Sequence, residues 1–134
     1  MHNKKDAQEL AFCYVNLCKI IAGMERRIAT ELSFGDEGYH AEFARELEKH
    51  ARNLRIFKDK FQKVLPLNGI KIFTPEIGEA FNSYYHIAEN IDSMTEDVDC
   101  FNNRPITSCK ESGISFVTNS GEEPLFKAVV TVEK

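Results

Sequence analysis

The sequence predicts an α+β protein in which an N-terminal hairpin of two long helices precedes a small all-β domain. Two observations support this class. In two long segments, apolar residues recur at alternating steps of four and three, which is the period of a packed helix. Beyond residue 70, short apolar runs are separated by glycine, proline and asparagine, as in strands joined by turns. We therefore place a helical region at residues 1–69 and a β domain at residues 70–134.

The first predicted helix runs from Asn3 to about Leu32, and Asn3 or Asp6 can cap its start. Its apolar stripe has heptad spacing and consists of Leu10, Tyr14, Leu17, Ile21, Met24 and Ile28. Further apolar side chains, such as Val15 and Ile20, widen this stripe. A helix with so broad an apolar face requires more than one neighbouring helix.

The segment 33–38 contains two glycines and an acidic pair, which predict a short turn. The second helix is expected from Tyr39 to about Leu65, because Pro66 and then Gly69 end it, with Gly69 in a left-handed conformation. Its apolar stripe consists of Phe43, Leu47, His50, Leu54, Phe57, Phe61 and Val64.

A lone hairpin would leave much of these two stripes in water. Each such side chain contributes about 1.5–3 kcal/mol when it becomes fully buried. The simplest solution is a homodimer in which two hairpins form a four-helix bundle. The candidate dimer-interface residues are Leu17, Ile21, Met24, Ile28, Leu47 and Leu54.

The β domain is expected to contain five short strands. They are placed at residues 70–73, within 84–91, and at 106–109, 114–117 and 126–132. Two connections are expected between them, an exposed acidic one at residues 94–103 and a loop at residues 119–124.

Composition excludes several classes of protein. Hydrophobic residues make up 43% of the 134 residues and charged residues 28%, which is typical of a globular chain. The net charge of −4 argues against a nucleic-acid partner, which favours a basic surface. No long uncharged apolar run predicts a membrane span, and no signal peptide is evident, so we expect a cytoplasmic protein without a membrane partner.

Motifs for catalysis are also missing from the pattern, since neither a nucleophile elbow nor a phosphate-binding loop occurs. We therefore expect no enzyme, no cofactor and no metal. Glu37-x-x-His40 matches one unit of a di-iron bundle, which a homodimer would duplicate. Cys100 and His86 are a conceivable thiol–imidazole pair, although His86 is more simply a hydrogen-bonding residue of a turn. The four cysteines include no Cys-x-x-Cys pair and are expected to be reduced thiols.

Four segments resemble, in their order and spacing, the GrpE family of nucleotide exchange factors for DnaK-type chaperones. Residues 16–28 resemble the helical D-L-L-P-V-x-D-N-L-E-R-A-L pattern, and residues 68–72 resemble the K-x-G-V-x-x-I junction. Residues 78–88 resemble G-E-x-F-D-P-x-x-H-E-A. Residues 113–114, followed by 125–132, resemble G-Y and L-R-P-A-x-V-x-V. The likeness covers about residues 12–132.

The resemblance implies a homodimeric co-chaperone of protein folding and the stress response. Its β domain would bind the ATPase domain of a DnaK-type chaperone and promote the release of ADP. The expected partner-binding residues are Gly69, Phe116, Val117, Asn119, Leu125, Phe126 and Lys127. For Phe116 and Leu125 the alternative is a place in the core of the β domain.

Departures from the family pattern at Asn82, Ser83 and Phe126 favour a second hypothesis. The Asp-Pro of the family turn is Asn82-Ser83, and the arginine before the final strand is replaced by Phe126 with Lys127 beside it. Only about ten residues precede the bundle helix, so the long paired helix of the family is not expected here. The second hypothesis is a dimeric adaptor of the same fold that docks without promoting exchange.

Overall fold

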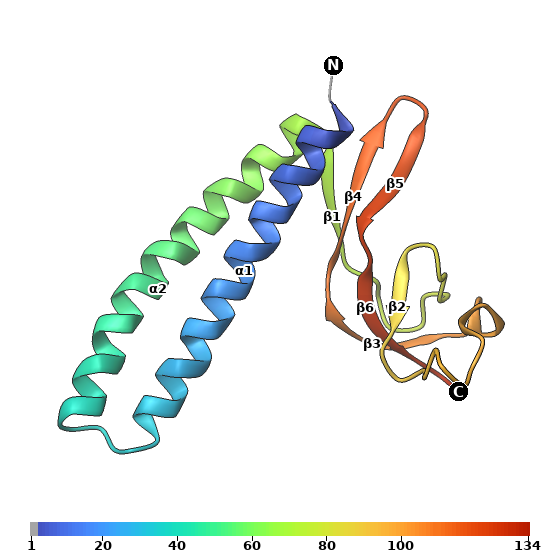
Figure 1. Cartoon of the computed structure of the whole chain (residues 1–134). Coiled ribbons are helices and arrows are strands. Elements are labelled where there is room, and N and C mark those ends of the chain that lie inside the picture. The colour runs from blue at the N-terminus through green and yellow to red at the C-terminus, as the bar shows by residue number, and fades with distance from the viewer. Residues whose placement is uncertain (1–2) are drawn as a thin grey trace. The chain divides into compact units, whose positions relative to one another are not determined.

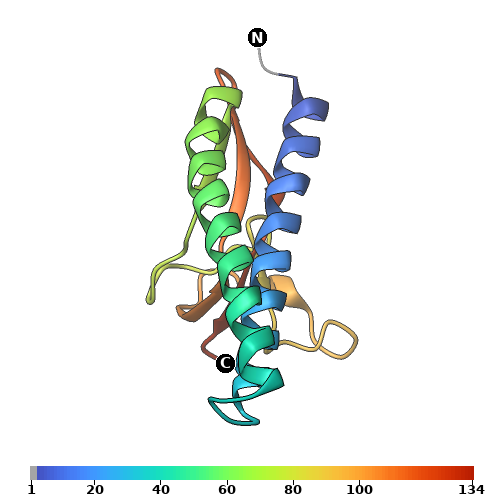
Figure 2. The ribbon, with the colours of Figure 1, turned by 90° about the vertical axis from the view of Figure 1, so that its left-hand side faces the viewer.

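The computed structural model describes residues 3–134 and contains two compact units (Figure 1). The helical unit, Gln8–Leu67, is formed by α1 (Lys4–Leu32) and α2 (Tyr39–Val64). These helices run side by side in opposite directions, as Figures 1 and 2 both show. Asn68–Lys134 belong to the second unit, which holds all six strands. The predicted α+β class, with helices first and a small β unit after them, is confirmed.

The helix ends follow from local residues. The Asn3 side chain accepts a hydrogen bond from the Lys5 backbone N–H at 2.8 Å and so caps α1. α2 is followed by a 3₁₀ turn at Leu65–Asn68, where Pro66 cannot continue the α-helical hydrogen bonding. Gly69 then adopts a φ of 74°, the left-handed conformation expected of it.

Small side chains form the line on α2 that faces α1. Ala41 and Ala51 are 0% exposed and Ala44 is 2% exposed, and their spacing places them on one side of the helix. On α1, Ile21 is buried, and Tyr14 is buried with its ring 5.7 Å from that of Phe61 on α2. The alanines are the most deeply buried line of α2. The predicted α2 stripe, from Phe43 to Val64, lies beside this line: Phe43 and Phe61 contact Arg27 and Tyr14 of α1, while Phe57 and Val64 remain exposed.

The β unit contains two three-stranded sheets. In the first, β4 (Gly113–Thr118) pairs antiparallel with β1 (Ile70–Phe73) and with β5 (Gly121–Phe126). In the second, β6 (Ala128–Val132) pairs in parallel with β2 (His86–Ala88) and antiparallel with β3 (Ile106–Glu111). The core of the unit contains Phe81, Ala88, Ile91, Ile106, Ala128, Val130 and Val132.

Two predicted connections are partly wrong. Residues 119–124, expected as a loop, include most of β5, and Pro124 lies opposite Ser115. Proline is tolerated there because β5 is an edge strand, whose outer side needs no N–H donor. The acidic connection at residues 94–103 contains a 3₁₀ helix, Val98–Phe101, and both of its end residues pack against the core.

Two glycine substitutions test this packing in opposite directions. A Cβ added at Gly113 would lie 2.2 Å from the Phe73 ring, so Gly113→Ala is expected to destabilise the β unit by about 1–3 kcal/mol. In α1, a Cβ at Gly23 meets nothing closer than 3.7 Å, and Gly23→Ala is expected to stabilise the helical unit by about 0.5–1 kcal/mol. Urea unfolding followed by circular dichroism measures both changes. An unchanged midpoint for Gly113→Ala would contradict the place assigned to Phe73.

Candidate protein-interaction site

The contacts between α1 and α2 identify a first face of the hairpin and the line along which the two helices meet. On the first face, Glu31 of α1 contacts His40 of α2 at 2.5 Å, and the Arg27 guanidinium lies over the Phe43 ring at 5.8 Å. Along the line of the buried alanines, Arg55 of α2 donates hydrogen bonds to Glu25 of α1, at 3.3 Å, and to Glu48. The line between the helices therefore includes charged contacts as well as alanines.

Residues seven apart lie on nearly the same side of paired helices, so these contacts assign the remaining positions. On α1, the positions at multiples of seven residues from Glu31 and Arg27 lie on the first face. On α2, the same holds for the positions at multiples of seven from His40 and Phe43. Most of them are large and apolar. We call this surface the apolar face, and its apolar members are Leu10, Leu17, Ile20, Met24, Phe43, Leu47, Leu54, Phe57, Phe61 and Val64.

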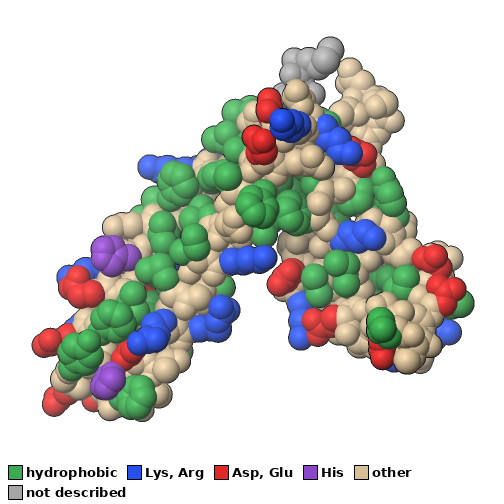
Figure 3. All heavy atoms as spheres, viewed as in Figure 1, with side chains coloured by type: hydrophobic (Ala, Val, Ile, Leu, Met, Phe, Trp, Pro, Cys, Tyr) green, Lys and Arg blue, Asp and Glu red, His purple; other side chains and the backbone are tan. Residues whose placement is uncertain are grey.

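Much of the apolar face is open to solvent. Ile20 and Phe57 are each 55% exposed, Val64 is 45% exposed and Phe43 is 37% exposed. In Figure 3, hydrophobic side chains gather along both helices on the visible side of the hairpin. A contiguous apolar surface of this kind usually marks a contact with another protein.

The predicted dimer residues divide into two groups. Leu17, Met24, Leu47 and Leu54 lie half-buried on the apolar face. Ile21 is only 5% exposed and belongs to the seam between α1 and α2. Ile28, seven residues further along α1, lies on the same line as Ile21 and is half-buried. The first group retains surface that another chain can cover.

The predicted partner-binding residues of the β unit are also unequal. Phe116 is 4% exposed, which leaves little of its ring for a partner, although it is not among the core residues of the β unit named above, and Leu125 is half-buried. Val117, next to Phe116, is 39% exposed, and its backbone N–H donates a hydrogen bond to the Gly69 carbonyl at 2.7 Å. The structure thus joins the Gly69 junction to β4.

The other predicted contacts lie at the two ends of β5. Asn119 is exposed in the turn between β4 and β5. At the far end, Phe126 is half-buried as the last residue of β5, while Lys127, between β5 and β6, is exposed. The Lys127 ammonium donates a hydrogen bond to the Ser83 carbonyl at 2.8 Å.

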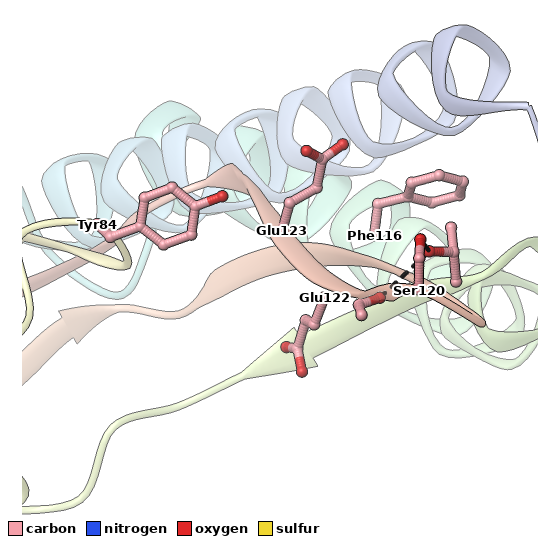
Figure 4. Close-up of a pocket in the computed structure, with 7 residues that line it drawn as sticks. Tyr84, Phe116, Ser120, Glu122 and Glu123 are labelled. Atoms are coloured by element: carbon pink, nitrogen blue, oxygen red, sulfur yellow. Dashed lines mark hydrogen bonds between the residues drawn. The ribbon is translucent and has the colours of Figure 1, made fainter.

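A shallow depression of about 380 Å³ adjoins the β4–β5 hairpin. Figure 4 shows that Glu123 and Phe116 project to one side of the hairpin and Glu122 to the other, as the pairing of Phe116 with Glu123 requires. The lining residues are Tyr84, Phe116, Thr118, Ser120, Gly121, Glu122 and Glu123. Sequence analysis did not predict Tyr84 or the two glutamates as lining residues. The glutamates were missed because Glu122-Glu123-Pro124 has the composition of a loop.

His86 is a structural residue, as expected from its turn. It is 6% exposed, its Nδ1 accepts the Asn82 N–H at 3.0 Å, and its ring lies 5.8 Å from that of Phe81. Burial lowers the pKa of His86, although nearby Glu79 opposes this effect. Cys100 is exposed and its thiol contacts Asp97, so the structure does not bring it to His86.

The proposed half of a di-iron site is not assembled either. His40 contacts Glu31, while Glu37 lies in the exposed turn. Within residues 3–134, no cluster of histidine, cysteine, aspartate and glutamate is suited to hold a metal ion. Among the described residues, neither helix has the length and apolar character needed to cross a membrane.

The helical unit therefore has a partly exposed apolar face, and the β unit has exposed side chains such as Val117, Asn119 and Lys127. Comparisons with protein-family models, with curated protein sequences and with solved structures found no match for this chain. Its function must therefore be argued from its own residues.

The burial of His86 predicts a specific pH dependence. Its folded-state pKa lies below the ordinary 6.5, so below that pH the unfolded chain binds a proton that the folded unit excludes. Stability of the β unit is therefore expected to fall as pH drops from about 7 to about 5.5. Urea unfolding at the two pH values measures the difference, and His86→Phe should reduce it. Equal pH dependence in His86→Phe and the unaltered protein would refute this role.

Proposed function

We propose that this protein is a homodimeric exchange factor of the GrpE type, which releases ADP from the ATPase domain of a cytoplasmic DnaK-type chaperone. One observation carries the proposal: the four GrpE-like segments fall on successive parts of a helical hairpin and a β unit. Residues 16–28 lie in α1, 68–72 form the junction with β1, and 78–88 surround His86. Residues 125–132 contain the end of β5 and all of β6.

A second copy of the chain is the proposed occupant of the apolar face. Each of its large side chains contributes up to about 1.5–3 kcal/mol when a partner covers it completely. Association costs about 4–15 kcal/mol in lost translational and rotational freedom. Several exposed residues per copy, including Ile20, Phe57 and Val64, are enough to offset this cost, because a two-fold interface uses each of them twice.

Exchange requires no bond to be made or broken. The β unit must bind the open form of the ATPase domain more tightly than the closed form that retains ADP. By thermodynamic reciprocity, ADP then weakens binding of the factor. A hundredfold weakening of ADP binding through this coupling corresponds to about 2.7 kcal/mol. Val117, Asn119, Phe126 and Lys127 are the residues proposed to make the contact, together with the Gly69 junction.

One observation favours the alternative, a dimeric adaptor that binds the chaperone without accelerating exchange. Lys127 already donates to the Ser83 carbonyl, and Phe126 is half-buried. Neither residue offers the free, forked donor that an arginine would present at this position. The adaptor keeps the same dimer and the same docking surface.

Release of fluorescent ADP distinguishes the two functions. A DnaK-type ATPase domain from the same cell is loaded with the labelled nucleotide, and release is timed with and without this protein. Accelerated release supports the exchange factor, and unchanged release with measurable binding supports the adaptor. Failure to bind any such chaperone defeats both.

Substitution in the apolar face tests the dimer. Leu54→Asp places a charge on this face and is expected to weaken dimerisation at least tenfold, about 1.4 kcal/mol or more. Asn53→Asp introduces the same charge at the adjacent exposed position and is the matched control. Sedimentation velocity across a concentration series reports the dissociation constant. Equal behaviour of the two variants would contradict the proposed interface.

The junction between the units gives a separate prediction for partner binding. Gly69→Asp puts a side chain on backbone with a φ of 74° and is expected to weaken chaperone binding at least tenfold while the helical circular dichroism stays unchanged. Gly35→Asp is the matched control, since that glycine has a φ of 124° within the helical unit. Normal binding by Gly69→Asp would remove the junction from the docking surface.

A further inference from the structure

The tip of the helical hairpin, residues 31–43, differs in composition from the helices that lead to it. It contains four carboxylates, those of Glu31, Asp36, Glu37 and Glu42, and neither lysine nor arginine. Lysine and arginine are instead frequent along the rest of both helices. The tip is therefore a local region of negative charge.

Aromatic rings accompany this charge and face solvent. Phe34 is 65% exposed, Tyr39 is 76% exposed and Phe43 is 37% exposed. The rings hold one another in place: Phe34 stacks on His40 with centroids 4.4 Å apart, and the Tyr39 and Phe43 planes differ by only 2° at 6.4 Å. Exposed rings in such an arrangement are typical of the central residues of a protein interface.

The buried carboxylate of Glu31 holds His40, and with it the aromatic residues of the tip, in position. Glu31 is 5% exposed, and it contacts His40 Nδ1 at 2.5 Å and accepts from Arg27 Nε at 2.9 Å. The hydrogen bond with His40 and the one from Arg27 both lower the pKa of Glu31, which keeps it ionised. Backbone hydrogen bonds, such as Gly35 N–H to the Leu32 carbonyl, also order the turn. A surface held in this way loses little conformational freedom when it binds a partner.

The remaining carboxylates of the tip are free to interact. Asp36, Glu37 and Glu42 take part in none of the ion pairs found within residues 3–134. Phe34 and Tyr39 stand near them in the chain, so exposed π faces and unpaired negative charges occur together. Guanidinium groups combine with both, since they stack on aromatic faces and donate paired hydrogen bonds to carboxylates.

We propose that the aromatic tip is a docking surface for an arginine-bearing peptide segment of another protein. Charge complementarity selects a basic occupant, and the stacked rings favour arginine over lysine. The surface lies in the helical unit and uses none of the residues assigned to chaperone binding, so it stands or falls independently of nucleotide exchange. It shares Phe43 with the apolar face, whereas Phe34 and Tyr39 belong to the tip alone.

Fluorescence anisotropy with a labelled peptide of alternating arginine and glycine tests the proposal on the full chain. A peptide with glutamine in place of arginine is the uncharged control. Phe34→Ser combined with Tyr39→Ser is expected to weaken binding of the arginine peptide at least tenfold. Tyr84→Ser, which removes an exposed tyrosine of the β unit, should change it less than twofold. Circular dichroism confirms that each variant retains its helices.

Amide chemical shifts of the labelled protein locate the bound peptide. The expected result is that peaks of residues 31–43 move on titration. Equal affinity of the tip variant and the unaltered protein would overturn the proposal, as would shifts confined to the β unit. A tip variant that loses dimerisation while it still binds the peptide would also overturn it, because the occupant of the tip would then be a second copy of this chain.

Discussion

The alanine line on α2 is the constraint on which the arrangement of the helical unit depends. Ala41, Ala44 and Ala51 are almost fully buried, so the hairpin closes on small side chains of α2, and Tyr14 of α1 packs further along against Phe61. The large residues of α2 are therefore displaced to one side, where they join Leu17, Ile20 and Met24 to form the apolar face. Charged contacts such as that of Arg55 with Glu25 continue the line of the alanines between the helices. The same packing that stabilises the hairpin thus leaves its apolar face partly exposed to solvent.

The β unit achieves its stability differently. Its core needs the 3₁₀ helix at Val98–Phe101 and the turn around His86 as well as the two sheets, since Val98, Phe101 and Phe81 all contribute to it. Outside this core, Val117 of β4 and residues at the ends of β5 remain exposed to solvent. A hydrogen bond from the Val117 N–H to the Gly69 carbonyl joins Gly69 to β4. A β unit with its own core can act as a stiff surface against another protein, which differential binding to two chaperone conformations requires.

Much of this architecture was predictable from the residues alone, and the misses have physical causes. Heptad spacing predicted both helices, the two glycines of residues 33–38 predicted the turn between them, and Pro66 and Gly69 predicted the end of α2 and the left-handed residue after it. The alanine line and the line of large apolar residues are adjacent on α2 and have the same heptad spacing. Spacing alone therefore could not show that the alanines are the more deeply buried of the two. It also missed β5, since Pro124 marks a loop in most contexts but is tolerated on an edge strand. Of the expected partner-binding residues, Phe116 proved to be only 4% exposed, which alternation along β4 alone could not reveal. The aromatic tip was missed because its charge and its rings belong to a segment with the composition of a turn.

Hydrogen exchange of the α2 backbone as a function of protein concentration tests the central claim most directly. If the apolar face is covered by a second copy, amides of α2 near Leu54 and Phe57 should exchange more slowly as the concentration rises through the dissociation constant, while those of the β-unit core stay constant. Protection of α2 that is independent of concentration from the nanomolar to the high micromolar range would contradict the account, because the hairpin would then be stable with its apolar face open.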